Sequence, residues 1–220
     1  MSDRLIINAA LGAHYVRGQA RLVHSLLDTG YTGDVWAVDK PPSQDFDLSN
    51  PYTVKAAAFE HVLSFGYRFI VWMDASAVAV KSLDPLFERI EQRGYYLASS
   101  GYNAAQTCTD AQLEAANMTR NGVVSIPDSA TGCIGIDTHN PRSIAFLNQW
   151  ITWAKMGLFG GSRTHDVRDS KDPRFLFGRQ DQSAATLLAW MHGMELDHLG
   201  DLTGYWPPND TTVIVYKGIQ

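Results

Sequence analysis

The run Phe69-Ile70-Val71-Trp72-Met73 constrains the fold most, because it is apolar throughout and ends directly in a carboxylate, Asp74. A strand with one face in water alternates apolar and polar residues, whereas a strand covered on both faces does not. The run therefore predicts a central strand of a parallel sheet with helices on both faces. A carboxylate at the end of such a strand is costly to bury without a partner, so Asp74 is the first candidate site residue.

Strand and helix patterns alternate on both sides of this run. Strands are predicted at 5–7, 34–39, 95–98, 133–136 and 211–216, and helices at 15–27, 53–65, 84–93, 109–118, 141–156 and 181–191. A long polar loop is predicted at 157–178. The alternation predicts an α/β fold with a central, mostly parallel sheet flanked by helices. We expect residues 1–220 to form a single domain, since two cores would both be small.

The composition narrows the class of partner. A net charge of −5 argues against a surface built to neutralise many phosphates of duplex nucleic acid. No long apolar segment is predicted to act as an export signal or membrane span, so we expect no membrane partner. Two cysteines, Cys108 and Cys133, make neither a disulfide framework nor a zinc set, and a reducing cytoplasm is the expected compartment.

Ligands of open α/β sheets bind outside the carboxyl ends of the strands, so the polar residues after apolar runs are the site candidates. Three junctions satisfy this rule: Asn8 to Gly12, Asp74-Ala75-Ser76, and Gly132-Cys133-Ile134-Gly135.

These junctions lie in an order that resembles the GT-A glycosyltransferases, from about Leu5 to Gly193. The motifs that carry the resemblance are Val54-Lys55-Ala56, Phe69 to Ser76, Ser82 to Leu86, Gly132 to Ile136, Phe146 to Trp150 and Asp181-Gln182-Ser183. The resemblance implies a GT-A-like, Rossmann-like domain. It also implies transfer of a sugar from a nucleotide-sugar, expected to be a UDP-sugar, to an acceptor that can be a saccharide, a protein, a small molecule or a modified nucleobase.

In the family an Asp-X-Asp motif holds Mn²⁺ or Mg²⁺, but here Ser76 stands in place of the second Asp. A hydroxyl is a weak ligand for a hard cation, which puts metal dependence in question. The first metal candidate is Asp74 and the second is His198, for which a surface histidine is the favoured alternative. If no metal binds, positive side chains are expected to face the diphosphate. The alternative is that the arginines belong to a solvated loop. These side chains are Lys55, Arg163, Arg168, Arg174 and Arg179.

The resemblance, together with the chemistry of the side chains, indicates the remaining site residues. Asp181 and Gln182 are the expected catalytic residues, although Asp181 also suits a helix N-cap. Tyr205 and Trp206 are expected to stack on the acceptor or to pack in the core. Tyr15 is expected to stack on the base or to pack on its helix. The expected donor-binding residues are Asn8, Ala9, Ala10, Gly12, Tyr15, Lys55, Asp74, Ser76, Gly132 and Gly135.

Two other functions remain open. A nucleotidyltransferase shares this kind of sheet but normally has a Gly-rich, basic phosphate loop after the first strand, and Ala9 to His14 fits that pattern poorly. A catalytically inactive GT-A-like domain, kept for binding or assembly, would tolerate Ser76.

Overall fold

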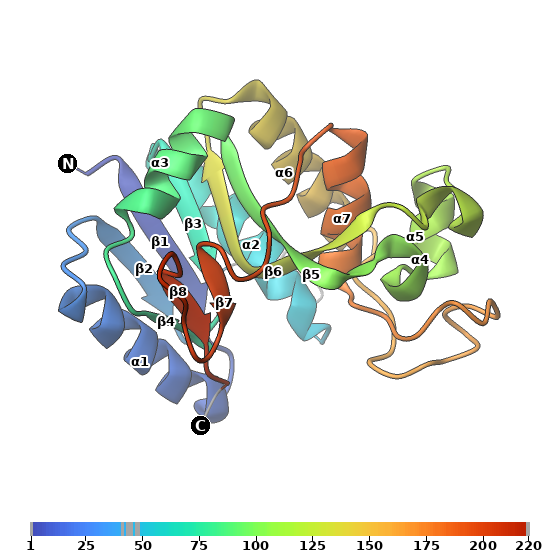
Figure 1. The fold of residues 1–220 in the computed structure, drawn as a ribbon, viewed down its shortest axis with the longest axis horizontal. Helices are drawn as coiled ribbons and strands as arrows, with labels where there is room; N and C mark the ends of the chain where they lie inside the picture. Colours follow the sequence, from blue (N-terminus) through green and yellow to red (C-terminus); the bar gives the residue numbers. More distant parts are fainter. Residues whose placement is uncertain (1, 41, 43–45, 47–48, 219–220) are drawn as a thin grey trace.

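A five-stranded sheet in the order β2-β1-β3-β6-β5 forms the centre of the fold (Figure 1). The computed structural model describes residues 2–40, 42, 46 and 49–218. Strand β1 (Arg4–Ala9) pairs in parallel with β2 (Asp34–Val38) and with β3 (Phe69–Met73). Strand β6 (Pro127–Asp137) is antiparallel to both β3 and β5 (Tyr95–Asn103). The prediction of a mostly parallel central sheet is confirmed.

The sequence predicts a third carboxyl-end junction at Gly132 to Gly135, but β6 runs antiparallel to β3. Because β6 runs opposite to β3, its residues Thr131 and Gly132 lie beside the end of β3, where the Asp74 N–H donates to Gly132 O over 2.8 Å. Gly135 instead pairs with Val71 inside the sheet. A side chain at Gly135 would collide with Ile90, so this glycine serves packing between sheet and helix.

Helices cover both faces of the sheet, as the apolar run of β3 predicts (Figure 1). Ile70 and Trp72 pack in one core with α2 (Val54–Val62), α6 (Pro141–Lys155) and α7 (Asp181–Met191). Phe69, Val71 and Met73 pack in the other core with α1 (Ala13–Asp28) and α3 (Asp84–Arg93). The alternation of side chains along a strand therefore divides one apolar run between two cores.

Shorter elements connect these layers. They are α4 (Ala104–Thr107), α5 (Asp110–Ala115) and the 3₁₀ helices η1 (Pro51–Thr53), η2 (Leu63–Phe65) and η3 (Arg120–Val123). Two predicted start signals are confirmed: Asn140 caps α6 before Pro141, and Thr109 forms a capping box with Gln112. Asp181 is not an N-cap, because it lies inside α7 and Gln180 is the cap residue. Among the described residues, no helix combines the length and apolar content that a membrane crossing requires.

A second sheet, in the order β4-β8-β7, was only partly predicted from sequence. The predicted C-terminal strand corresponds to β8 (Ile214–Tyr216), while β4 (Ala77–Ala79) and β7 (Thr203–Tyr205) are too short for a periodic signal. The backbone N–H of Lys217 donates to Ser76 O over 3.0 Å. The C-terminal strand is thereby fixed against the turn that follows Asp74.

The predicted loop between α6 and α7 closes on itself at a narrow neck. The Gly178 N–H donates to Ser162 O over 2.6 Å, and a Cβ on Gly178 would lie 2.9 Å from Gly161 Cα. Gln112 joins the two ends, because its Nε2 donates to Leu158 O (2.8 Å) and to Gln180 O (3.0 Å). The loop therefore leaves the fold and returns to it at one place.

A substitution at Gly18 of α1 tests how closely this helix must approach the turn after β3. A methyl group at Gly18 would collide with the backbone carbonyl of Ala75. Helix propensity alone favours Gly18→Ala by about 1 kcal/mol. We expect the collision to prevail and to lower the free energy of unfolding by about 1–3 kcal/mol in urea titration.

The control for this experiment lies on the exposed face of the same helix. Ala20→Gly should lose about 1 kcal/mol through propensity alone. A Gly18→Ala protein more stable than the wild type would show that α1 does not need this close contact.

Candidate active site

A cavity of about 630 Å³ opens at the carboxyl ends of β1 and β3. Its walls come from the end of β1, the segment around η1 and α2, the turn after β3, the middle of β6 and the chain from Phe177 to Gln182. The cavity therefore lies where the topology of open α/β sheets places ligands.

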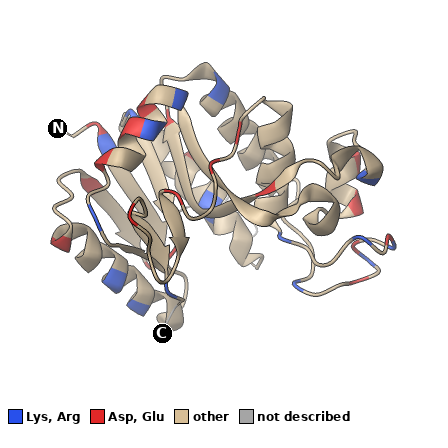
Figure 2. Cartoon of the chain, in the orientation of Figure 1, with Lys and Arg blue, Asp and Glu red and all other residues tan. Residues whose placement is uncertain are grey.

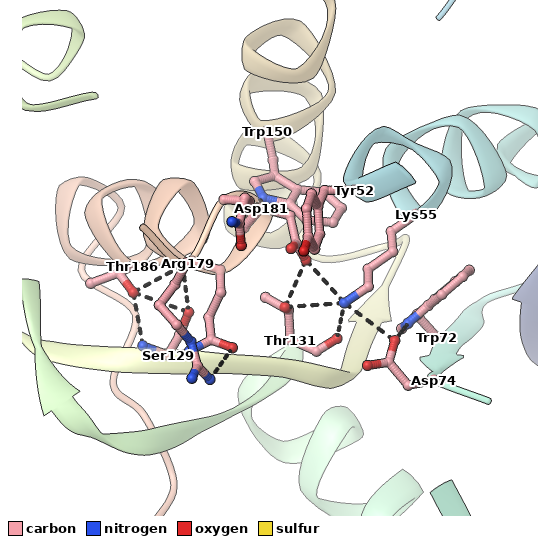
Figure 3. Close-up of polar contacts among 12 residues, drawn as sticks. Tyr52, Lys55, Trp72, Asp74, Ser129, Thr131, Trp150, Arg179, Asp181 and Thr186 are labelled. Atoms are coloured by element: carbon pink, nitrogen blue, oxygen red, sulfur yellow. Dashed lines mark hydrogen bonds and ion pairs between the residues drawn. The ribbon is translucent and has the colours of Figure 1, made fainter. Parts of the chain in front are cut away.

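Lys55 lines this cavity and lies between two carboxylates (Figure 3). Its Nζ is 3.2 Å from Asp74 Oδ1 and 3.0 Å from Asp181 Oδ2. The same ammonium donates to the backbone oxygen of Thr131 at 3.0 Å. Lys55 is only 9% exposed, and a buried ammonium is tolerated because these oxygens replace water.

The two carboxylates are held by further donors. Trp72 Nε1 donates to Asp74 Oδ1 over 2.7 Å, and Thr131 Oγ1 donates to Asp181 Oδ2 over 2.7 Å. In each carboxylate these contacts and the ion pair with Lys55 use the same oxygen atom. This leaves the geometry of both groups fixed while their other oxygens can accept hydrogen bonds from a ligand.

Charge and burial shift the pKa values of Lys55 and Asp74. Burial lowers the pKa of Lys55, but Asp181 and Asp74 outweigh it, so the net pKa is raised and the ammonium persists. Burial raises the pKa of Asp74, and the contacts from Lys55 and Trp72 only partly offset it.

Local sequence explains why Lys55 reaches this place. It lies in the first turn of α2, followed by Ala56, Ala57 and Ala58, which are all fully buried. Small side chains let the helix lie close to the sheet, so that the lysine stem runs along apolar surface to the strand ends.

Two tyrosines and an arginine form the wall near β1. Tyr15 and Tyr52 both line the cavity, and Arg163 Nε donates to the Tyr52 hydroxyl over 2.6 Å. The Arg163 guanidinium carbon lies 5.6 Å from the centroid of the same ring. This wall thus combines flat aromatic surface with a positive charge.

Gln182 connects the opposite wall to a buried carboxylate. Its Oε1 accepts from Arg179 Nη2 over 2.9 Å, and its Nε2 donates to Asp128 Oδ2 over 2.8 Å. Asp128 is 0% exposed, and Ser100, Thr107 and Thr186 also donate to its carboxylate. This network fixes the orientation of the Gln182 amide.

A divalent cation, which the family resemblance implies, does not fit the residues present. Asp74 Oδ1 already accepts from Trp72 and Lys55, which leaves one oxygen of this carboxylate for a cation, and the neighbouring Ser76 offers only a neutral hydroxyl. His198 is exposed and does not line the cavity. In the parts of the chain that the structure describes, no group of three His, Cys, Asp or Glu residues is arranged to hold a metal.

The cavity brings together many of the residues singled out from sequence, whose roles stay predictions. They are Ala9, Tyr15, Lys55, Asp74, Ser76, Gly132, Asp181 and Gln182. Of the loop arginines, Arg163 and Arg179 line it, while Arg168 and Arg174 are ion-paired with Asp166 and Asp172.

Other predicted donor-binding residues lie outside the cavity lining, for structural reasons. Asn8 is buried, where its Nδ2 donates to Met73 O (2.6 Å) and its Oδ1 accepts from Gln19 (2.8 Å), so it joins β1 to β3 and α1. The N–H of buried Ala10 donates to Val38 O. Gly12, with φ of 103°, starts α1, and Gly135 lies inside the sheet.

The predicted acceptor residues also lie outside the lining. Tyr205 and Trp206 are exposed rather than packed in a core. The Lys217 ammonium lies 3.7 Å from the Trp206 ring centroid, and Tyr205 packs edge-on against Tyr216.

Sequence reasoning missed Trp72, Tyr52 and Thr131 as site residues. Trp72 carries a usable signal, because it lies two residues before Asp74 and strand side chains alternate, so both project to the same side. Thr131 carries none, since its place depends on the direction of β6. The position of Tyr52 at the cavity depends on the path of the chain before α2.

Comparison with solved structures shows the fold. Mouse xyloside xylosyltransferase 1 superposes with a TM-score of 0.55 at 11% identity, covering 98% of this chain and 97% of the mouse chain. A glycosyltransferase involved in glycosylation of the major capsid of PBCV-1 gives 0.53 at 7% identity, covering 96% and 92%. The galactosyltransferase LgtC gives 0.50 at 10% identity, covering 96% and 85%. The fold is therefore that of the GT-A glycosyltransferases.

Sequence comparison adds nothing to this likeness. No protein-family model matches the chain, and no curated protein matches it either.

Removing the Lys55 charge should destabilise the protein in a pH-dependent way. Lys55→Met leaves two carboxylates facing one another without their shared cation, which should cost about 3–5 kcal/mol at pH 8. Without the lysine, which lowers it, the pKa of Asp74 should rise further in the folded state, so protonation on acidification favours the folded form. The deficit relative to wild type should shrink as pH falls from 8 to 5, measured by urea unfolding.

Lys155→Met provides the matched control. Lys155 pairs with Glu60 at 2.7 Å on the surface, so its loss should cost less than about 1 kcal/mol at either pH. A deficit for Lys55→Met that is small, or equal at both pH values, would contradict the proposed charge balance.

Proposed function

We propose that this chain is a glycosyltransferase that moves a sugar from a nucleotide-sugar, a UDP-sugar, to a hydroxyl of an acceptor. The observation that carries the proposal is the Asp74–Lys55–Asp181 triad at the floor of a strand-end cavity in a GT-A fold. Xylosyl and galactosyl transfer by proteins of this fold supports the same class of reaction here.

The donor is assigned to the wall near β1 and to the turn after β3. Ala9 leaves room for the backbone to approach a nucleoside, and Tyr15 and Tyr52 offer rings for the base. Asp74, directed into the cavity with one oxygen atom fixed, suits a sugar hydroxyl. The transferred sugar then lies between Asp74 and Asp181 over the Lys55 ammonium.

The reaction requires one bond to form as another breaks. The acceptor oxygen bonds to the anomeric carbon, the bond from that carbon to the diphosphate breaks, and the nucleoside diphosphate leaves with the electron pair. Asp181 is placed to orient the reacting hydroxyls and to receive the proton released by the acceptor. Lys55 and Thr131 keep this carboxylate in position.

Fixed cations, rather than a metal ion, are proposed to balance the charge of the diphosphate. Arg163 lies on the donor wall and has no carboxylate partner among the described residues. Near Ser76, the guanidinium of Arg21 donates from Nη2 to Ser76 O over 3.3 Å. Guanidinium groups suit phosphate oxygens at such a site.

A thermal-shift screen tests the donor site. UDP, GDP, CMP, their sugars and the nucleoside triphosphates UTP, GTP and CTP should be compared in EDTA and in Mn²⁺, because a ligand that binds only the folded state raises Tm. We expect a shift with UDP and UDP-sugars that is equal in both buffers. Ser76→Asp adds a hard oxygen ligand beside Asp74, and its shift with UDP should become larger in Mn²⁺ than in EDTA.

The outcomes separate the alternatives. A shift in wild type only with Mn²⁺ would contradict the fixed-cation assignment. A preference for nucleoside triphosphates without nucleotide-sugars would favour a nucleotidyltransferase, and no shift with any nucleotide would overturn the donor site.

Asp181→Asn tests catalysis separately from binding. The amide keeps the shape of the carboxylate but cannot accept a proton, so turnover of the donor should fall about 10²–10⁴-fold. The affinity for UDP should change less than about threefold, since the nucleotide wall is untouched. Release of UDP from the donor found in the screen is the measurement.

Asp84→Asn is the control, because Asp84 pairs with Arg4 on the surface and should keep full turnover. Nucleotide binding without turnover in the wild type would identify an inactive binding domain instead.

A further inference from the structure

Four arginines lie in the loop between α6 and α7 or at its end, and they are of two kinds. Arg168 and Arg174 point to carboxylates of their own loop, at 2.5 Å from Asp166 and 2.6 Å from Asp172. In Figure 2 acidic and basic positions accordingly alternate along this loop. Arg163 and Arg179 line the cavity instead, and no described carboxylate forms an ion pair with either of them.

Arg179 is held in place by neutral groups. Its guanidinium carbon lies 5.8 Å from the ring centroid of Tyr102 and 5.7 Å from that of Phe177. The two rings pack edge-to-face at 5.1 Å, and Arg179 Nη2 donates to Gln182 Oε1. The side chain is thus ordered before a ligand arrives, while its charge is not neutralised.

The position of Arg179 separates it from the donor. In Figure 3 Arg179 lies on one side of Thr131 and Asp181, and Asp74 lies on the other. The transferred sugar, placed over Lys55 between Asp74 and Asp181 in the proposed function, lies between Arg179 and the nucleotide. Arg179 therefore faces the space left for the acceptor, an assignment that rests on that proposed function.

The balance of charge in the cavity supports a negatively charged ligand in addition to the sugar. Three cationic side chains line it, Lys55, Arg163 and Arg179, against two carboxylates, Asp74 and Asp181, although the whole chain has a net charge of −5. Lys55 is engaged by both carboxylates. Arg163 on the donor wall and Arg179 on the opposite wall are thus the cations available to ligands.

We propose that Arg179 binds an anionic group, a carboxylate or a phosphate, on the acceptor next to the hydroxyl that receives the sugar. The planar guanidinium matches the oxygens of either group, and Tyr102 and Phe177 provide apolar surface for the rest of the acceptor. A neutral acceptor would leave this charge facing the cavity without a partner.

The test compares three small probes on the intact protein with UDP at saturation. Methyl β-glucoside is neutral, methyl β-glucuronide carries a carboxylate, and glucose 6-phosphate carries a phosphate. Calorimetric titration should give Kd values for at least one charged probe about tenfold or more below that of the neutral one. The charged probe that binds distinguishes a carboxylate from a phosphate acceptor.

Arg179→Gln should remove this preference, and Arg174→Gln should not. Both are arginines of the same chain segment, but Arg174 is ion-paired with Asp172 outside the cavity. In Arg179→Gln the charged probe should bind about tenfold or more weakly, while the neutral probe and UDP change less than about threefold. A Tm within a few degrees of wild type shows that the variant folds.

Several results would overturn the assignment of Arg179. The wild type could bind all three probes with the same affinity, or bind none of them. Arg174→Gln could lose as much affinity for the charged probe as Arg179→Gln. UDP binding that weakens as much as probe binding would place Arg179 on the donor. Should wild type bind no nucleotide, the proposed function fails, and titration of the probes without nucleotide still decides whether Arg179 selects anions.

Discussion

The rest of the site depends on the ion pairs that the Lys55 ammonium forms with Asp74 and Asp181. It joins residues from four elements, because α2 supplies the lysine, the end of β3 supplies Asp74, β6 supplies Thr131 and α7 supplies Asp181. Two ionised carboxylates in this partly buried place repel each other, and the ammonium between them offsets that repulsion. The ion pairs therefore fix the start of α7 against the sheet, and with it the neighbouring Arg179 and Gln182.

The two faces of β3 explain how the sheet serves both stability and chemistry. Its side chains alternate between two helical cores, so the strand is rigid up to Met73, and polar residues begin only where the strand ends. Trp72 belongs to both regions: its ring packs in a core, and its Nε1 donates to Asp74 over 2.7 Å. A carboxylate fixed by a core residue keeps its orientation without a ligand.

The elements with long periodic patterns were predictable from sequence, whereas chain direction and distant contacts were not. The apolar run of β3 and the capping signals of α5 and α6 predicted these elements because local residues determine them. Asp74, Lys55 and Asp181 were found through their motifs. The direction of β6 reverses the meaning of the Gly132–Gly135 segment, and no local pattern encodes it. Asn8 follows the strand-end rule, yet pairing with Met73 and Gln19 keeps it out of the cavity.

The neck at Gly161 and Gly178 separates the loop from the machinery that follows it. Because the loop leaves and returns at one point, residues between these glycines can change in number and kind without displacing Gln180 or Asp181. Arg163 and Phe177 lie inside the excursion, and Arg179 lies just beyond it. A segment that begins and ends at one point can thus be exchanged as a unit, while the sheet and its charged centre keep their positions.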